Sequence, residues 1–116
     1  MTPLQSYQKW VLKGSFDPFA HTRNTGELMY LGLSLTGESG EFAEDVKKLV
    51  REHGYDAMNM LTDQQRQKLI LEAGDVQWYL MRICSLLQIT PEELIDANIE
   101  KLTTRHGGAE PDVRFD

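Results

Sequence analysis

The sequence predicts an all-α protein that folds as a small four-helix bundle. Apolar residues recur every three to four positions along most of the 116 residues, and no segment shows the strict alternation typical of a strand. Thr90 followed by Pro91 and two acids is a strong helix start. The chain is long enough for one hydrophobic core without disulfide bonds. We therefore expect a single domain over residues 1–108 and a polar tail over 109–116.

Start and stop signals divide the chain into four helices. The first lies between Pro3, which is favoured in a first turn, and Gly14, which is favoured after a last turn. Thr62 or Asp63 can cap the third helix, and the fourth ends near His106. The expected helices cover about residues 3–13, 26–52, 63–87 and 91–106, and loops cover 14–26 and 54–62.

Composition and charge exclude several classes of protein. The formal net charge is −6, and no cluster of Lys and Arg forms the broad positive surface that nucleic-acid binding needs. The N-terminal residues lack the apolar core of a signal peptide, and no apolar run reaches membrane-spanning length. The single cysteine, Cys84, offers no disulfide framework. We expect a cytoplasmic protein that binds neither nucleic acid nor a membrane.

Two acidic pairs are the most informative feature of the chain. Glu38 and Glu41 lie three residues apart in the second expected helix, so both project from one face. Glu72 and Asp75 have the same spacing in the third. Each pair falls within or beside the apolar stripe of its helix, where carboxylates are costly unless they are paired or bound to cations. Because oxygen ligands suit Mg²⁺ or Mn²⁺ better than zinc, we predict a site for hard divalent cations.

Other interpretations of these pairs stay open. Exposed acidic pairs often form only a solvated face. A carboxylate-bridged di-iron centre needs Glu-x-x-His on two helices, and the histidines here lie in loops or at helix ends, which disfavours it. Glycines interrupt both helices beside the pairs, and we expect them to let the helices approach closely enough to share ions. They are Gly37, Gly40 and Gly74.

Four further residues are candidates for contacts with an anionic substrate. Asn98 and Lys101 lie one turn apart on the fourth helix, where they could hold sugar and phosphate oxygens. Tyr79 follows the second acidic pair on the same helix face. Lys48 has the same relation to the first pair, although an ion pair with a neighbouring acid such as Asp45 is the more common fate of a surface lysine. With metal ions bound, such a site suits hydrolysis of a polyphosphate.

The third helix carries apolar residues on two sides. Besides its main stripe, Ile70, Trp78, Met81 and Cys84 make much of the opposite side apolar. A helix that is apolar nearly all round must be covered on both sides, and four helices offer little such cover. We therefore expect self-association through this face.

Three blocks of this sequence resemble the signature blocks of MazG-like nucleotide pyrophosphohydrolases. They are LGLSLTGESGEFAEDVKKLVREHG, LEAGDVQWYL and ITPEELIDANIEKLTTRHG, and the resemblance covers about residues 4–107. The combination of E-x-x-E, E-x-x-D and N-x-x-K is specific, whereas one block alone is weak. The resemblance implies an all-α MazG fold and Mg²⁺-dependent cleavage of nucleoside triphosphates to monophosphate and pyrophosphate.

The resemblance also implies an assembly and individual residue roles. Proteins of this kind are similar to dimeric dUTPases and phosphoribosyl-ATP pyrophosphohydrolases, and they form dimers or tetramers. Asn98 and Lys101 match the family's substrate-contacting block, and Glu41 or Glu38 would orient or deprotonate the attacking water. The implied metal ligands are Glu38, Glu41, Glu72 and Asp75.

Two functions from different classes follow. One is an enzyme that hydrolyses non-standard or excess (deoxy)nucleoside triphosphates and so cleans the nucleotide pool. The other is a catalytically silent helical module that binds a nucleotide or regulates a partner. The intact set of four carboxylates, together with Asn98 and Lys101, favours the enzyme. The base of the nucleotide is not identified by the sequence.

Overall fold

The computed structural model of the chain describes residues 1–105, so the expected end of the domain at 108 and the tail over 109–116 lie outside the described residues. No strand occurs in residues 1–105, which confirms the predicted all-α class. The segment expected as a loop over 54–62 consists largely of a short 3₁₀ helix. The elements are α1 (Pro3–Lys13), α2 (Thr25–His53), the 3₁₀ helix η1 (Gly54–Met60), α3 (Asp63–Leu86) and α4 (Pro91–Arg105).

Side-chain caps determine where the helices begin. Thr2 and Gln5 form a capping box at the start of α1, and Thr62 and Gln65 form another at the start of α3. The side chain of Asn24 caps α2, which begins one residue earlier than expected. Each cap satisfies backbone N–H groups that the first turn of a helix leaves free. The predicted helix boundaries are therefore confirmed to within a residue or two.

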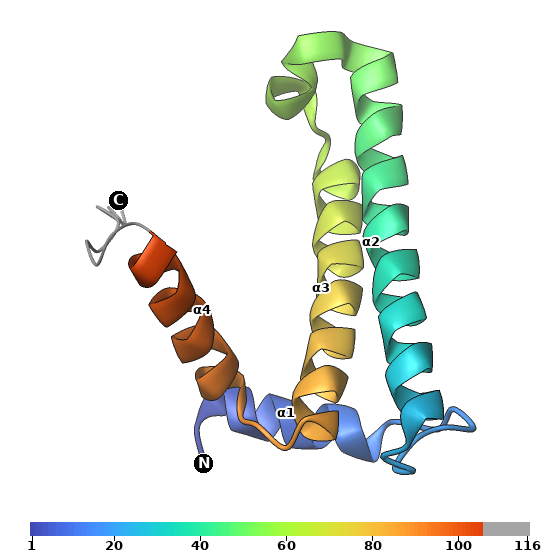
Figure 1. Cartoon of the computed structure of the whole chain (residues 1–116). Coiled ribbons are helices and arrows are strands. Elements are labelled where there is room, and N and C mark those ends of the chain that lie inside the picture. The colour runs from blue at the N-terminus through green and yellow to red at the C-terminus, as the bar shows by residue number, and fades with distance from the viewer. Residues whose placement is uncertain (106–116) are drawn as a thin grey trace.

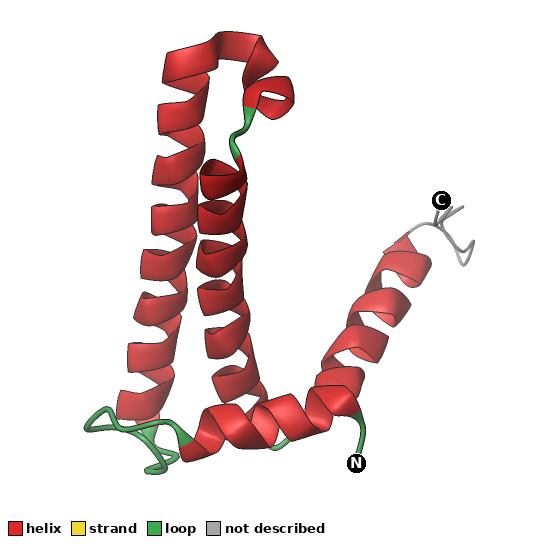
Figure 2. Cartoon of the chain, turned by 180° about the vertical axis from the view of Figure 1, so that it is seen from behind, coloured by secondary structure: helices red, strands yellow, loops and turns green. Residues whose placement is uncertain are grey.

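α2 and α3 form a long antiparallel hairpin, which η1 closes at one end (Figure 1). α1 crosses the opposite end of this hairpin, which we call its base. α4 also starts at the base, but it points away from the hairpin (Figure 2). Among the described residues α4 contacts α1 and α3 and makes no contact with α2. One chain alone therefore leaves the long face of the hairpin open.

The hydrophobic core lies at the base and is small. Val11 of α1 packs with Met81 and Cys84 of α3, and Tyr7 and Trp78 border this cluster. The expectation that this side of α3 lacks cover within the chain was wrong at the base, because α1 covers it. Farther along α3 the expectation holds, since Ile70 is 45% exposed. Burial of free Cys84 raises the pKa of its thiol, as expected for a residue that acts as a packing group.

A buried arginine joins three segments at the base. Arg82 of α3 is 1% exposed, and its guanidinium bonds to Asp17 at 2.5 Å and to Glu27 at 3.1 Å. The Glu27 carboxylate also accepts hydrogen bonds from the backbone N–H groups of His21 and Arg23, both of which have positive φ. Burial disfavours the charged guanidinium, but the two carboxylates outweigh that effect and raise the pKa of Arg82. This ion triad attaches the loop before α2 to α3.

The direction of α4 is determined by contacts at its start. Pro91 is buried, and Glu92 accepts hydrogen bonds from Thr2 at 2.6 Å and from Gln5 at 3.2 Å. The hydrogen bond from Thr2 lowers the pKa of Glu92. Beyond these hydrogen bonds, α4 exposes apolar side chains in the part of the chain that the structure describes; Ile95 is 47% and Ile99 55% exposed.

The three glycines beside the acidic pairs do not have the predicted role within one chain. A Cβ atom added at any of them would meet no atom within 4 Å, so close approach of α2 to α3 does not depend on the missing side chains. They are Gly37, Gly40 and Gly74. None of the helices in residues 1–105 is both long and apolar enough to cross a membrane.

Candidate metal centre

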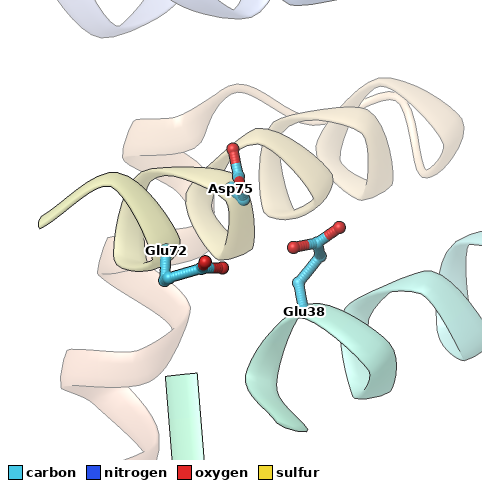
Figure 3. Close-up of side chains that lie close together, drawn as sticks. All are labelled: Glu38, Glu72 and Asp75. Carbon is cyan, nitrogen blue, oxygen red and sulfur yellow. The ribbon is translucent and has the colours of Figure 1, made fainter. Parts of the chain in front are cut away.

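Carboxylates from both helices of the hairpin converge near its middle. Glu38 projects from α2, Glu72 and Asp75 project from α3, and the three side chains lie close together (Figure 3). One carboxylate oxygen from each lies within 4.8 Å of the others. The antiparallel pairing of α2 with α3 brings together residues that are 34 to 37 positions apart in the sequence, which spacing on one helix could not reveal. We call these three residues the acidic cluster.

The acidic cluster lacks compensating partners. Within residues 1–105, Oε2 of Glu38 and Oε2 of Glu72 are buried atoms with no hydrogen-bond partner, whereas Asp75 is exposed. Partial burial, followed by repulsion from Glu41, Asp75 and Glu72, raises the pKa of Glu38. Burial, and then the neighbouring carboxylate of Glu41, likewise raises the pKa of Glu72. The chain therefore holds these groups where their ionised forms are disfavoured.

Glu41 lies beside the cluster without belonging to its tightest group. Its charge acts on both Glu38 and Glu72, which places it between the two helices. It borders a hollow together with Glu72. All four predicted metal ligands thus lie in one region. Three of them form the acidic cluster, and Glu41 lies at its edge.

Aromatic side chains border the cluster on the side toward the base. Trp78 and Tyr79 line a shallow hollow of about 270 Å³ with Glu38 and Asp75. Burial is the main cause that raises the pKa of Tyr79, and the charge of Glu38 adds to it. The Tyr79 phenol therefore stays protonated and can donate a hydrogen bond. The guanidinium carbon of Arg82 lies over the Trp78 ring, 5.5 Å from its centroid, and this cation–π contact helps to hold the ring in place.

Lysines border the cluster on the side toward η1. Lys48 of α2 and Lys68 of α3 line a hollow of about 210 Å³ together with four carboxylates, those of Glu41, Glu44, Asp45 and Glu72. Lys48 does not have the ion pair with Asp45 that is the common fate of such a lysine, because Asp45 pairs with Lys68 at 3.2 Å. Lys48 therefore remains available beside the cluster.

The predicted residues of α4 do not join this group within one chain. Asn98 and Lys101 are exposed on α4, which contacts only α1 and α3 near the base. The structure thus brings Tyr79 and Lys48 to the acidic cluster and leaves Asn98 and Lys101 away from it.

Sequence reasoning missed two residues around this region, Arg82 and Lys68. Arg82 supports the aromatic wall, and a single charge within the apolar run WYLMRICSLL was the available signal. Lys68 lies four residues before Glu72, so helical spacing alone could have placed it on the acidic face. Asp45 was named from the sequence as a possible partner of Lys48, but its pairing with Lys68 across the hairpin depends on tertiary structure.

The donor set fits a hard divalent cation. All the groups that converge are carboxylates, with no His or Cys among them, and unpartnered oxygens point into the cluster. Mg²⁺ and Mn²⁺ prefer such oxygen ligands, and a dication would remove the repulsion that raises the pKa values. Glu38, Glu72 and Asp75 could hold the ion directly, and Glu41 is near enough to join them.

Comparison with known proteins supports this interpretation. The family model described as the MazG nucleotide pyrophosphohydrolase domain matches residues 27–109, which include both acidic pairs. "Gene 37 protein" of Mycobacterium phage L5 is 35% identical over 78 residues, which cover 67% of this chain and 65% of the phage protein. The chain thus spans just under two thirds of the length of that relative. No solved structure matches the chain. By its sequence match and its all-α fold, the chain belongs to the MazG nucleotide pyrophosphohydrolase family.

Proposed function

We propose that this protein is a Mg²⁺-dependent nucleoside triphosphate pyrophosphohydrolase that serves nucleotide-pool housecleaning. It would add water across the bond between the α- and β-phosphates of a (d)NTP and release (d)NMP and pyrophosphate. The observation that carries this proposal is the acidic cluster, whose buried oxygens have no partner, within a chain of the MazG family. Buried carboxylate oxygens without partners do not stabilise a fold, so such a cluster is expected at a site that binds a ligand.

The acidic residues have distinct roles in this proposal. Glu38, Glu41, Glu72 and Asp75 would hold Mg²⁺, with Mn²⁺ as a substitute. When bound, the dication supplies the positive charge that lets a triphosphate approach this acidic surface. Glu41 or Glu38 would orient the attacking water and take its proton. The rim position of Glu41 supports that role, because it leaves the carboxylate accessible.

Tyr79 and Lys48 would contact the substrate from opposite sides of the cluster. The Tyr79 phenol, which burial keeps protonated, can donate to a sugar or phosphate oxygen. Lys48, which is exposed, can donate to phosphate oxygens.

The remaining predicted contacts need a second copy of the chain. α4 is clamped in a direction that takes Asn98 and Lys101 away from the acidic cluster of their own chain. Its exposed Ile95 and Ile99 require cover, and so does the apolar part of the hairpin near Ile70. A homodimer or homotetramer in which α4 lies on the hairpin of a partner would meet both needs and complete the site.

The decisive test is pyrophosphate release from a panel of canonical, deoxy and oxidised nucleoside triphosphates, with and without Mg²⁺. At least one triphosphate should be cleaved, only with the metal, and Glu38→Gln and Glu72→Gln should remove the activity. Glu52→Gln, the same change at an exposed residue near the end of α2, is the matched control and should leave it intact. Binding of Mg²⁺ and nucleotide without any turnover would instead identify a catalytically silent module.

A further inference from the structure

Two ion pairs determine how α2 and α3 face each other. Near the base, the Glu27 carboxylate of α2 lies 3.1 Å from the Arg82 guanidinium of α3. Near η1, the Asp45 carboxylate of α2 lies 3.2 Å from Nζ of Lys68. The residue numbers of these pairs add up to 109 and 113. In two antiparallel helices that sum stays nearly constant, and residues four apart share a face. Residues whose numbers add up to 109 or 113 therefore face each other between the two ion pairs.

Two hydroxyl groups of α2 face Tyr79 in this register. The numbers of Ser34 and Tyr79 add up to 113, and those of Tyr30 and Tyr79 add up to 109. Tyr30, Ser34 and Glu38 follow one another at intervals of four residues, so all three lie on one face of α2. Tyr30, Ser34 and Tyr79 are all half-buried. The polar contact between the helices thus continues from the acidic cluster toward the base as a set of hydroxyl groups.

The two hydroxyl groups act on the Tyr79 phenol in opposite directions. Burial is the largest cause that raises the pKa of Tyr79, hydrogen bonding with Ser34 lowers this pKa, and hydrogen bonding with Tyr30 raises it. A hydroxyl that donates to the phenol oxygen favours the ionised form, whereas an acceptor for the phenol O–H favours the neutral form. Ser34 therefore acts as a donor to the Tyr79 oxygen, and Tyr30 acts as an acceptor for its O–H.

The loop before α2 supports the ring of Tyr30. The ring centroids of Phe19 and Tyr30 lie 5.6 Å apart, and the rings are tilted by 36°. Gly26 leaves room for this contact, because a Cβ atom there would lie 2.9 Å from the Phe19 ring. The backbone N–H of Phe19 donates to the side chain of Asp17, which in turn pairs with Arg82. The Tyr30 ring therefore has support that does not depend on its hydroxyl group.

We propose that Ser34 positions the Tyr79 phenol for the substrate, and that Tyr30 accepts the phenol O–H only while the site is empty. This inference rests on the proposed function, in which Tyr79 donates to a sugar or phosphate oxygen. Tyr79 lines the hollow beside Glu38, and Ser34 acts through it. Because Ser34 holds the phenol oxygen, the O–H can rotate from Tyr30 to the substrate without movement of the ring. A donor that is already in place costs less ordering when the ligand binds.

Unfolding in urea tests the contact without any ligand. Ser34→Ala and Tyr79→Phe remove the two ends of one hydrogen bond. The unfolding midpoint of the double variant should therefore shift by less than the sum of the two single shifts. Ser39→Ala changes the other serine of α2, which is exposed, and its shift should add to that of Tyr79→Phe. Additive shifts for Ser34→Ala and Tyr79→Phe would show that the two side chains do not interact and would overturn the proposal.

Calorimetry with non-hydrolysable nucleotides tests the two roles. The α,β-imido analogues of the canonical ribo- and deoxynucleoside triphosphates are titrated into each variant with Mg²⁺ present. For the analogue that wild type binds most tightly, Ser34→Ala should weaken binding about fivefold, as expected for one neutral hydrogen bond. Ser34→Thr, which keeps the hydroxyl, should restore it. Tyr30→Phe should bind at least as tightly as wild type, because it removes only a competing acceptor. Ser39→Ala, the matched control, should change nothing.

A variant that lacks the phenol hydroxyl separates positioning from a general effect on the fold. In the Tyr79→Phe background, Ser34→Ala should cause no further loss of binding. A further fivefold loss there, or weaker binding by Tyr30→Phe than by wild type, would overturn the assigned roles. So would a wild-type protein that binds none of the analogues. These measurements need no turnover. A protein that binds through Tyr79 and Ser34 but cleaves no triphosphate would contradict the proposed function and leave the positioning role standing.

Discussion

Helix α3 carries charged groups at two places, and the protein compensates them differently. At the base, Arg82 lies between Asp17 and Glu27 and neutralises both carboxylates. Two to three turns away toward η1, half-buried Glu72 and Glu38 opposite it each have one buried oxygen without a hydrogen-bond partner in the described residues, and Asp75 beside them is exposed. The first arrangement is complete when the chain folds. In the proposed function the second is completed by a ligand that supplies positive charge, and this difference would separate a structural ion triad from a binding site.

The difference also appears in how each place tolerates change. Removing the cation of a closed triad leaves two buried charges without a partner, so stability must fall. Neutralising a carboxylate of the open cluster removes repulsion, so stability of the metal-free protein should rise while function is lost. The predictions below test this opposition, beginning with the largest expected effect.

Arg82→Met should destabilise the fold by about 3–5 kcal/mol, because Asp17 and Glu27 would lose their partner within a buried site. Urea unfolding followed by circular dichroism measures the change. Arg66→Met, an exposed arginine on the same helix, is the control and should have little effect. A loss below about 1 kcal/mol for Arg82→Met would show that the triad is no more than a surface ion pair.

Glu72→Gln should lower pyrophosphate release at least 100-fold, because a metal ligand supplies several kcal/mol of transition-state stabilisation. Without metal the same variant should unfold at a higher temperature than wild type at neutral pH, since one repelling charge is gone. Parallel activity assays and thermal melts test both parts. A Glu72→Gln variant with lower stability and full activity would contradict the assignment of Glu72 as a metal ligand.

The pH dependence of stability follows from the raised pKa values of Glu38 and Glu72. The folded state favours their protonated forms, so their stabilising contribution is present below the ordinary value of 4.5 and is lost as the pH rises through the raised values. Mg²⁺ requires the ionised forms, so its stabilising effect should grow over the same interval. Urea titrations across this range, with and without Mg²⁺, should show the two curves diverging; parallel curves would contradict the assignment.

Mixed oligomers test whether α4 completes the site of a partner. Glu72→Gln and Lys101→Met should each be inactive alone. Coexpressed, they should recover about a quarter of wild-type activity, because half of the dimers are mixed and each has one intact site of two. If each site used only residues of its own chain, no activity would return. A monomeric wild-type protein in analytical ultracentrifugation would exclude the arrangement directly.

The sequence predicted the helices well because their signals are local. Capping at Thr62 and the break at Gly14 depend on residues only a few positions apart, and periodicity revealed the pairs Glu38/Glu41 and Glu72/Asp75. What depends on pairing across the hairpin escaped prediction. The pairing of Lys68 with Asp45 and the buried position of Arg82 required the tertiary structure. The direction of α4 is determined by Thr2 and Gln5 at the opposite end of the chain, which no helical pattern indicates.

The glycines also show that a sequence pattern does not predict tertiary packing. Gly37, Gly40 and Gly74 suggested close helix packing, yet the space beside each of them is open within the chain. A residue pattern can indicate small size, but it does not show which neighbour, if any, uses the space. Packing partners are a tertiary property, and in an oligomer they can belong to another copy.

The most direct test of the central claim is the effect of Mg²⁺ on unfolding at neutral pH, measured for wild type and Glu72→Gln. The open cluster predicts that Mg²⁺ at about 100 times its dissociation constant stabilises wild type by about 2.7 kcal/mol and stabilises the variant far less. Lys47→Met, which removes a charge from the same hairpin away from the cluster, should respond like wild type. Equal stabilisation of wild type and Glu72→Gln, or none of either, would contradict the claim that the acidic cluster is a metal site.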